Sequence, residues 1–316
     1  MPLVYSGGNV DFVAGGCDMK VMVIGSTGQL GSDIIAALPR AGCTTIAVGG
    51  RQELDITNTP ALAAYLEAQR PDAVINTAAF HNVDLCERET EAAYNVNTVA
   101  VRGLALECQK RNVLFFQIGT DYVMEGHPEC RALPETAAVC PKSIYALTRY
   151  GGDCMTRTHA PTMGYVVRTC GLFGLAGCKV KGGLNFVDTM IAAARAGKPL
   201  RVVADQIVAP TPTDDLAKQL ILMLQRRPEP GLYHAVSHGQ CSWHEFACAA
   251  LAYAGIHYPI TSVSSDEFAA PAHRPRYSVL DNAHLRSAGL DMMTDWQSGL
   301  KRYIEKKYSP GGARKM

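Results

Sequence analysis

The sequence predicts an α/β protein built on a doubly wound parallel sheet, with a smaller α/β domain towards the C-terminus. Short apolar runs typical of buried strands alternate with segments of helical spacing, which indicates parallel strands joined by crossover helices. A glycine-rich turn connects the first apolar run directly to a helical segment. Polar residues follow several of the runs, at the edge of the sheet where such folds bind ligands.

We expect the first strand at residues 19–24, an apolar run with a single basic residue. Further strands are expected at residues 43–48, 72–76, 113–118 and 165–168. Among the helices between them, Thr59 and Pro60 resemble an N-cap followed by proline at the first helical position, which predicts a helix over Ala61 to Gln69. A long helix is expected at roughly residues 89–110.

The turn after the first strand reads Gly25-Ser-Thr-Gly28-Gln-Leu-Gly31. Glycines at this spacing let the backbone turn tightly and approach a pyrophosphate that lies on the N-terminus of the next helix. The spacing is one residue longer than the Gly-x-Gly-x-x-Gly fingerprint, and an ordinary glycine-rich turn is the alternative. The strand-turn-helix context favours a dinucleotide site in a Rossmann fold.

The end of the second strand bears on the choice of cofactor. A carboxylate there would bind a ribose 2′-hydroxyl and repel a 2′-phosphate. The chain reads Val48-Gly49-Gly50-Arg51 instead, and Arg51 can meet a 2′-phosphate with two hydrogen bonds. A solvated loop arginine is the alternative interpretation. The sequence therefore favours NADPH and leaves NADH possible.

Tyr145 and Arg149 form a Tyr-x-x-x-basic pattern. On a helix these two positions share one face. A tyrosine can donate a proton to a carbonyl as hydride arrives, and a fixed cation favours the phenolate of a group whose usual pKa is about 10. This pattern by itself is weak evidence for a catalytic pair. It gains weight from the nucleotide-binding fold predicted upstream of it.

At 316 residues the chain is long enough for one large or two modest domains. We expect a flexible N-terminal extension at residues 1–18, an NAD(P)-binding Rossmann domain at 19–170 and mainly a substrate-binding domain at 171–308. Segments around 201–225 are expected to return to the Rossmann sheet, and residues 309–316 to form a frayed tail.

The net charge of +1 gives no sign of nucleic-acid binding or of capture by an anionic membrane. No apolar run reaches the roughly 20 residues that a membrane span requires. The eleven cysteines contain no Cys-x-x-Cys pair, so we interpret them as thiols of a reducing cytoplasm. Cys170 follows a strand end near the expected site, although a buried structural thiol is the preferred interpretation. His234, His238 and His244 share no helical face, and we expect no metal site.

Several strings together resemble the dTDP-4-dehydrorhamnose reductase family of extended short-chain dehydrogenases. In the first half they are Gly28-Gln-Leu-Gly31, Glu53-Leu-Asp-Ile-Thr57, Arg70-Pro-Asp-Ala-Val-Ile-Asn76, Gly119-Thr-Asp-Tyr-Val123 and Tyr145 to Arg149. In the second half they are Asn185-Phe-Val187, Pro210 to Ala217, Gly239 to Phe246 and Arg274 to Asn282. The resemblance extends from Met19 to about Ile304.

The resemblance implies NAD(P)H-dependent reduction of a nucleotide-linked 4-keto-6-deoxysugar, with dTDP-4-dehydro-L-rhamnose as the expected substrate. It implies cofactor contacts from the glycine-rich turn, from the two residues bordering the adenine and from the residues lining the cleft, namely Gly25, Gly28, Gln29, Leu30, Gly31, Asp55, Ile56, Ala79, Phe80 and His81. Thr120 and Asp121 would face the sugar, Tyr145 would donate the proton, and Arg149 would contact the nicotinamide ribose.

Three residues depart from the family pattern. Arg149 stands where the family has lysine, Gly119 where it has serine, and Gly171 where it commonly has a tryptophan that packs on the sugar. Arginine keeps the charge of lysine but is larger and planar. Two alternatives therefore remain open: a non-catalytic NADP-binding regulatory subunit and a related epimerase or dehydratase. A homodimer is a further possibility.

Overall fold

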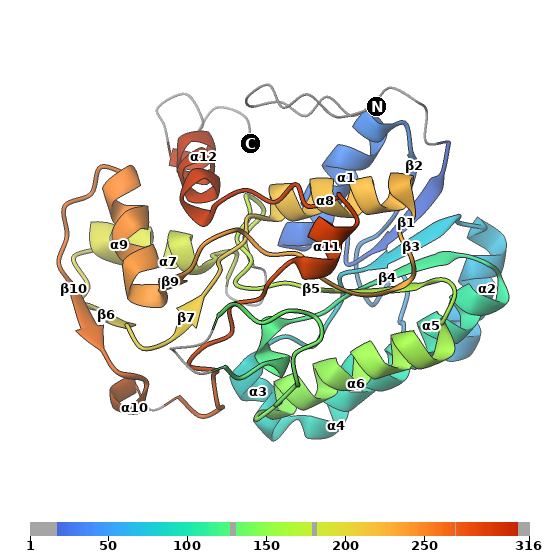
Figure 1. The fold of residues 1–316 in the computed structure, drawn as a ribbon, viewed down its shortest axis with the longest axis horizontal. Coiled ribbons are helices and arrows are strands. Elements are labelled where there is room, and N and C mark those ends of the chain that lie inside the picture. The colour runs from blue at the N-terminus through green and yellow to red at the C-terminus, as the bar shows by residue number, and fades with distance from the viewer. Residues whose placement is uncertain (1–17, 127–130, 179–181, 269, 309–316) are drawn as a thin grey trace.

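Six parallel strands form the main sheet, in the order β2-β1-β3-β4-β5-β8 (Figure 1). The computed structural model describes residues 18–126, 131–178, 182–268 and 270–308. Five strands lie where the sequence predicts them and the sixth lies further along; they are β1 (Lys20–Ile24), β2 (Thr44–Val48), β3 (Ala73–Asn76), β4 (Leu114–Ile118), β5 (Gly164–Arg168) and β8 (Gly231–His234). Because β1 pairs with β2 on one side and β3 on the other, the strand order reverses there, and the predicted doubly wound fold is confirmed.

Helices cover both faces of this sheet: α1 (Gln29–Ala37) and α8 (Thr213–Arg226) lie on one face, and α2 (Thr59–Gln69), α5 (Ala100–Lys110) and α6 (Ile144–His159) on the other (Figure 1). Side chains of β1 alternate between the two layers. Val21 and Val23 belong to the apolar cluster under α1 and α8. Met22 and Ile24 belong to the cluster under α2 and α5. The strand is therefore buried on both faces, as its continuous apolar run predicts.

The start of α2 differs from the prediction by one residue. Asn58, and not Thr59, is the N-cap, because its side chain accepts a hydrogen bond from the Ala61 N–H at 3.1 Å. Pro60 still lies in the first turn, where a missing N–H leaves no intrahelical bond unmade.

The helix expected at residues 89–110 is interrupted. It consists of α4 (Thr90–Tyr94), a π-helical turn η2 (Asn95–Val99) and α5. The π turn places the side chain of Asn97 in the interior. Turns of this kind are frequent at functional sites, and this one lies beside the cleft described below.

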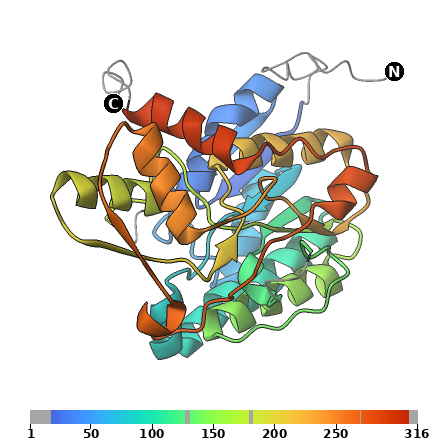
Figure 2. The same ribbon diagram turned by 60° about the vertical axis from the view of Figure 1, so that its left-hand side comes forward.

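A second group of elements follows β5 in the sequence. β6 (Leu200–Val203) pairs in parallel with β10 (Ile260–Val263), and β7 (Ile207–Val208) pairs in antiparallel with β9 (Cys241–Ser242). The helices α7 (Phe186–Arg195), α9 (Trp243–Tyr253) and α12 (Trp296–Tyr308) pack around a shared apolar cluster. In both ribbon views this group lies beside the main sheet (Figures 1 and 2).

Of the segments around 201–225 that were expected to return to the Rossmann sheet, only the helix α8 does so. Their strands, β6 and β7, pair outside the main sheet, and only α8 packs against it, on α1. The strand that does return is β8, which extends the sheet beside β5. The boundary at residue 170 stays a prediction. Of the expected N-terminal extension only Asp18 is described, and the tail 309–316 lies outside the described residues.

Short helices complete the described part: η1 (Leu38–Ala41), α3 (Val83–Arg88), η3 (Asp121–Val123), α10 (Ser265–Phe268) and α11 (Ala283–Ser287). Within the described ranges, no helix combines the length and the apolar character needed to cross a bilayer.

Candidate active site

A cleft of about 500 Å³ opens at the carboxyl ends of β1, β3, β4 and β5. This edge is where doubly wound sheets bind ligands, and the volume is typical of a small-molecule site. The loops after these strands line one side, and Phe186 and Trp243 of the C-terminal group line the other. The cleft brings together most of the predicted site residues: Gly25, Gly28, Gln29, Leu30, Ala79, His81, Thr120, Asp121, Tyr145 and Arg149.

The glycine-rich loop leaves the start of α1 open towards the cleft. Gly25 has a φ of +80°, and a Cβ at this position would lie 2.6 Å from Thr77 Oγ1. A Cβ on Gly31 would overlap the carbonyl oxygen of Gly25, so close packing requires both glycines. The N-cap of α1 is Gly28, which has no side chain, and the first turn carries no acidic residue. The N–H groups and dipole of α1 therefore suit a phosphate group.

Tyr145 lies in the first turn of α6, which is capped by Ser143: its Oγ accepts from a backbone N–H at 3.2 Å. The ring packs edge-on against Tyr122, with centroids 5.4 Å apart. Burial raises the pKa of Tyr145, while the charge of Arg149 and a hydrogen bond with Thr120 act in the opposite direction. The expected effect of Arg149 on the phenolate is therefore present, but burial outweighs it, and the phenol keeps its proton at neutral pH.

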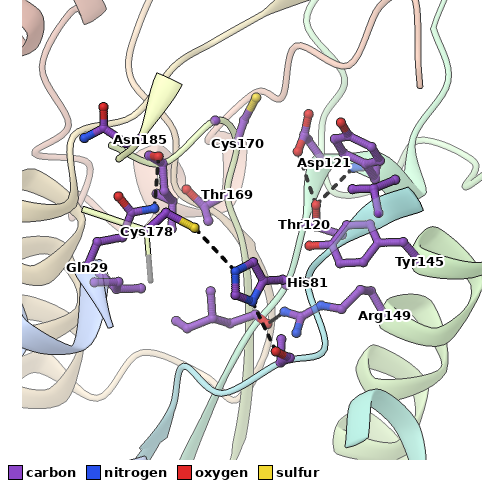
Figure 3. Close-up of a pocket in the computed structure, with 18 of the residues that line it drawn as sticks. Gln29, His81, Thr120, Asp121, Tyr145, Arg149, Thr169, Cys170, Cys178 and Asn185 are labelled. Carbon is purple, nitrogen blue, oxygen red and sulfur yellow. Dashed lines mark hydrogen bonds between the residues drawn. The ribbon is translucent and has the colours of Figure 1, made fainter. Parts of the chain in front are cut away.

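Arg149 lies one turn after Tyr145, and both side chains line the cleft, as their spacing predicts (Figure 3). Its side chain is buried and donates from Nη2 to the carbonyl oxygen of Ile118, at the end of β4. Nε is also buried, and it has no hydrogen-bond partner among the described residues. The guanidinium is thus fixed in place, and its Nε is still available as a donor.

Thr120 and Asp121 follow β4 after a single residue, Gly119. Thr120 Oγ1 donates to Asp121 Oδ1 at 3.3 Å, and Asp121 Oδ2 accepts from Ser278 Oγ at 2.6 Å. Burial raises the pKa of Asp121, although its hydrogen bond with Ser278 opposes this shift. Asp121 therefore connects the catalytic edge of the sheet to a C-terminal loop and fixes the orientation of Thr120.

The family model described as the RmlD substrate binding domain matches residues 19–309. The chain belongs to the RmlD family. It is 34% identical over 290 residues to the spore coat polysaccharide biosynthesis protein SpsK of Bacillus subtilis, covering 92% of this chain and 98% of that one. It is 34% identical to a dTDP-4-dehydrorhamnose reductase of Streptomyces griseus, covering 88% and 91% of the two chains.

Solved structures agree with this membership. A dTDP-4-dehydrorhamnose reductase from Bacillus anthracis, solved in complex with NADP, superimposes with a TM-score of 0.85 at 32% identity. The match covers 92% of this chain and 99% of that one. The family resemblance and the Rossmann-type fold predicted from the sequence are confirmed.

Gly119, where the RmlD family has serine, has a structural reason. A Cβ at this position would lie 2.8 Å from Arg168 Cγ and 3.2 Å from Asp153 Oδ1. Arg168 and Asp153 form a buried ion pair, with Nε and Oδ2 2.8 Å apart. This pair fills the space that a serine side chain would need, so the glycine and the ion pair belong together.

Gly171, where the RmlD family commonly has tryptophan, is also constrained. Its φ is +50°, and a Cβ would lie 3.1 Å from Trp243 Cη2. Trp243 lines the same cleft from the start of α9, and its ring lies 4.7 Å from that of Phe186. An indole therefore already occupies this wall of the cleft, although it comes from a different element.

Five predicted cofactor residues do not line the cleft: Gly31, Arg51, Asp55, Ile56 and Phe80. Arg51 is exposed and pairs with Asp55, with Nε and Oδ2 2.7 Å apart. Ile56 is buried in the core under α2. Phe80 contacts the π turn through its backbone, since its N–H donates to Asn97 Oδ1 at 2.8 Å. Direct cofactor contact by these residues stays a prediction.

Glu53 is a further candidate cofactor residue that the sequence did not indicate. Its Oε2 accepts a hydrogen bond from the Gly49 N–H at 2.7 Å, so a carboxylate does lie at the end of β2. The residues directly after the strand include no carboxylate. The side chain of Glu53 reaches back over four positions to Gly49. Trp243 was missed for a similar reason, since its approach to Gly171 spans 72 positions of sequence, the difference between the two residue numbers.

The three histidines considered for a metal lie on different elements. His234 lies on β8, His238 follows it, and His244 lies on α9. In the described part of the chain, no group of three or more His, Cys, Asp or Glu side chains could hold a metal ion.

Proposed function

We propose that this chain is an NADPH-dependent reductase that converts dTDP-4-dehydro-L-rhamnose to dTDP-L-rhamnose. The observation that carries the proposal is the position of Tyr145, Thr120 and Arg149 in one cleft with the open N-terminus of α1. The names of the RmlD relatives, and the NADP bound to one of them, support the same activity.

The residues of the cleft fit a dinucleotide. The start of α1 would hold the pyrophosphate through backbone N–H groups. Gln29 Oε1 is buried, lines the cleft and has no partner among the described residues, so it can accept from a ribose hydroxyl. The Nε of Arg149 is available for the nicotinamide ribose. When bound, NADPH supplies a hydride to the carbonyl carbon of the substrate.

The proposed preference for NADPH over NADH depends on two residues after β2. Arg51 has an exposed side chain that can turn to a 2′-phosphate, and its partner Asp55 is close by. The carboxylate of Glu53 would repel a 2′-phosphate. These opposing charges lead us to propose NADPH as the main cofactor, with NADH as a weaker alternative.

Tyr145 performs the acid step of the proposed reaction. Because its pKa is raised, the phenol is protonated at neutral pH and can donate to the oxygen of the reduced carbonyl. Arg149 and Thr120 then stabilise the phenolate that remains, since both lower the pKa of Tyr145. Thr120 also orients the substrate oxygen through its hydroxyl group.

The sugar lies at the other end of the cleft in this proposal. Trp243 and Phe186 provide an aromatic wall there, which suits the apolar face and methyl group of a 6-deoxysugar. Arg274 also lines the cleft and can pair with the diphosphate, although it currently holds Asp84 at 3.0 Å.

The decisive experiment measures NADPH oxidation with dTDP-4-dehydro-L-rhamnose and identifies the sugar product by NMR. We expect stoichiometric NADP and dTDP-L-rhamnose. A different 4-epimer as product would assign a sister reductase. Tight NADPH binding with no turnover of any dTDP-4-ketosugar would instead identify a regulatory subunit, and exchange without net NADPH oxidation would identify an epimerase.

A further inference from the structure

A cysteine and a histidine meet inside the cleft, and the proposed reduction uses neither for chemistry. Cys178 lies in the loop after β5, and His81 in the loop after β3. Cys178 Sγ and His81 Nε2 are 3.6 Å apart (Figure 3). Both side chains line the cleft, and in the close-up they lie between Gln29 on one side and Arg149 on the other.

The surroundings of His81 fix which ring nitrogen carries the proton. Nδ1 lies 3.2 Å from the carbonyl oxygen of Ala79, which can only accept a hydrogen bond. Nδ1 is therefore the N–H donor, and the Nε2 of the neutral ring presents a lone pair. The thiol of Cys178 then donates to Nε2. This is the arrangement in which an imidazole acts as the base of a thiol nucleophile.

The electrostatics of the cleft favour transfer of that proton. The hydrogen bond with Cys178 is the main cause of a raised pKa at His81, and the contact with Ala79 acts in the same direction, while burial opposes both. A protonated His81 beside the sulfur stabilises a thiolate, although the charge of Arg149 lowers the pKa of His81 and so acts against its protonation.

Other described thiols lack this arrangement. Burial raises the pKa of Cys86 to about 11 and also raises that of Cys170. Cys248 is the informative comparison, because it is exposed and also has a histidine neighbour, His244. Its sulfur is 3.9 Å from both ring nitrogens, so it faces no single lone pair, and its pKa is raised by burial and by Glu245.

We propose that Cys178 is a nucleophilic thiol activated by His81, and that it is a covalent modification site for soft carbon electrophiles. With an alkyl iodide, Sγ attacks the carbon and a C–S bond forms. The C–I bond breaks, iodide leaves with the electron pair, and the thiol proton passes to Nε2 of His81. The adduct projects into the cleft, which both Cys178 and Gln29 line, and excludes the dinucleotide, so modification inactivates the protein.

The test is limited alkylation of the full chain with iodoacetamide at pH 7, followed by peptide mass spectrometry at each cysteine. We expect Cys178 to react roughly tenfold faster than Cys248, in line with a larger thiolate fraction. His81→Ala should slow labelling of Cys178 by about the same factor and leave Cys248 unchanged. Saturating NADPH should protect Cys178 alone. Equal rates at Cys178 and Cys248, or no effect of His81→Ala, would overturn the proposal.

Loss of activity during the alkylation provides a second test of the proposal. Activity of the wild type and of Cys248→Ser should decay in step with labelling of Cys178. Cys178→Ser should keep its own starting activity under the same treatment, and inactivation of this variant at the wild-type rate would refute the link between adduct and activity. The labelling arm does not depend on turnover. A failure of the proposed reductase activity is therefore distinguishable from a failure of this inference.

Discussion

Tyr145 is the residue on which the proposed chemistry depends most directly. Replacing it with phenylalanine removes the proton donor and keeps the ring that packs against Tyr122. We expect turnover to fall by about 10²–10⁴-fold. The dissociation constant for NADPH, measured by fluorescence titration, should change little. A Tyr145→Phe variant with near-normal turnover would show that another group, or water, supplies the proton.

Arg149 is where the chain departs from its family at the reacting end of the cleft. Arg149→Ala removes the charge that lowers the pKa of Tyr145 and the donor that holds the Ile118 carbonyl. We expect weaker NADPH binding and at least tenfold slower turnover, the loss of about 1.4 kcal/mol of transition-state stabilisation. Arg149→Lys is the matched control, because it keeps the charge, and it should retain most activity.

The two variants distinguish a catalytic role of the Arg149 guanidinium from a packing role. Steady-state NADPH oxidation and cofactor affinity are measured for the wild type and both variants. If Arg149→Ala matches the wild type in both quantities, the guanidinium serves only to cap β4. If both variants are equally impaired, the planar group itself is required rather than its charge.

At the scale of single residues, the sequence predicts position in the cleft where that position depends on local spacing. Tyr145 and Arg149 are four positions apart on one helix, so their shared face was predictable, whereas the place of Thr120 in the site was expected from the family resemblance. Glu53 and Trp243 were not predictable in this way. Their roles depend on contacts with Gly49 and Gly171 that no local pattern encodes.

At the scale of elements, the π turn η2 connects the loop after β3 to α6. Asn97 Oδ1 accepts from the Phe80 N–H at 2.8 Å, and Nδ2 donates to the Phe80 carbonyl at 3.0 Å and to Thr148 Oγ1 at 3.1 Å. The loop before α3, which carries His81, is thereby fixed to α6, which carries Tyr145. Hydrophobic periodicity predicted one long helix here, because a single wide turn scarcely changes the apolar pattern.

We predict that Asn97→Ala destabilises the protein by about 1–3 kcal/mol, because the buried amide and hydroxyl groups that Asn97 satisfies lose their partner. The KM for NADPH should also rise, since the loop at Ala79 and His81 is no longer held. Urea unfolding and initial rates measure the two effects. Asn95→Ala, an exposed position in the same turn, is the control and should change neither. Equal behaviour of the two variants would contradict the bridging role.

The C-terminal group of elements shows a second limit of prediction from the sequence at this scale. Segments around 201–225 were expected to return to the main sheet, but β6 pairs with β10, which lies some 60 residues later in the sequence. The pattern of a strand predicts its burial and says little about its partner. By contrast, alternating apolar runs and helical segments predict a parallel, doubly wound sheet, and the order β2-β1-β3 is the reversal of strand order that such a sheet contains.

At the scale of the whole molecule, His234 contacts segments that are far apart in the sequence. It is fully buried on β8, and its backbone N–H donates to Glu135 at 3.0 Å. Nδ1 donates to the carbonyl oxygens of Leu133 and Asp281, at 3.1 and 3.2 Å. Burial lowers the pKa of His234 to about 3, and the charge of Arg168 acts in the same direction. The folded protein therefore holds this ring neutral.

This burial predicts a dependence of stability on pH with a defined sign. Between pH 6.5, the usual pKa of an unfolded histidine, and the folded value of about 3, the unfolded chain binds the proton and the folded chain does not. His234 thus contributes stability that is fully present above pH 6.5 and is lost as pH falls. From pH 7 to pH 5 the loss amounts to about 2 kcal/mol, at 1.36 kcal/mol for each pH unit below 6.5.

The measurement is the free energy of unfolding in urea at pH 7 and pH 5, for the wild type and for His234→Asn, whose amide can replace the Nδ1 donor. The variant is expected to lose about 2 kcal/mol less than the wild type over this interval, because it has no ring to protonate. His238→Asn is the control with the opposite sign, since Asp291 raises the pKa of His238 and its protonation favours the folded state. An identical pH slope in the wild type and His234→Asn would show that His234 can be protonated without unfolding, and that the junction between β8 and the C-terminal loops opens locally instead.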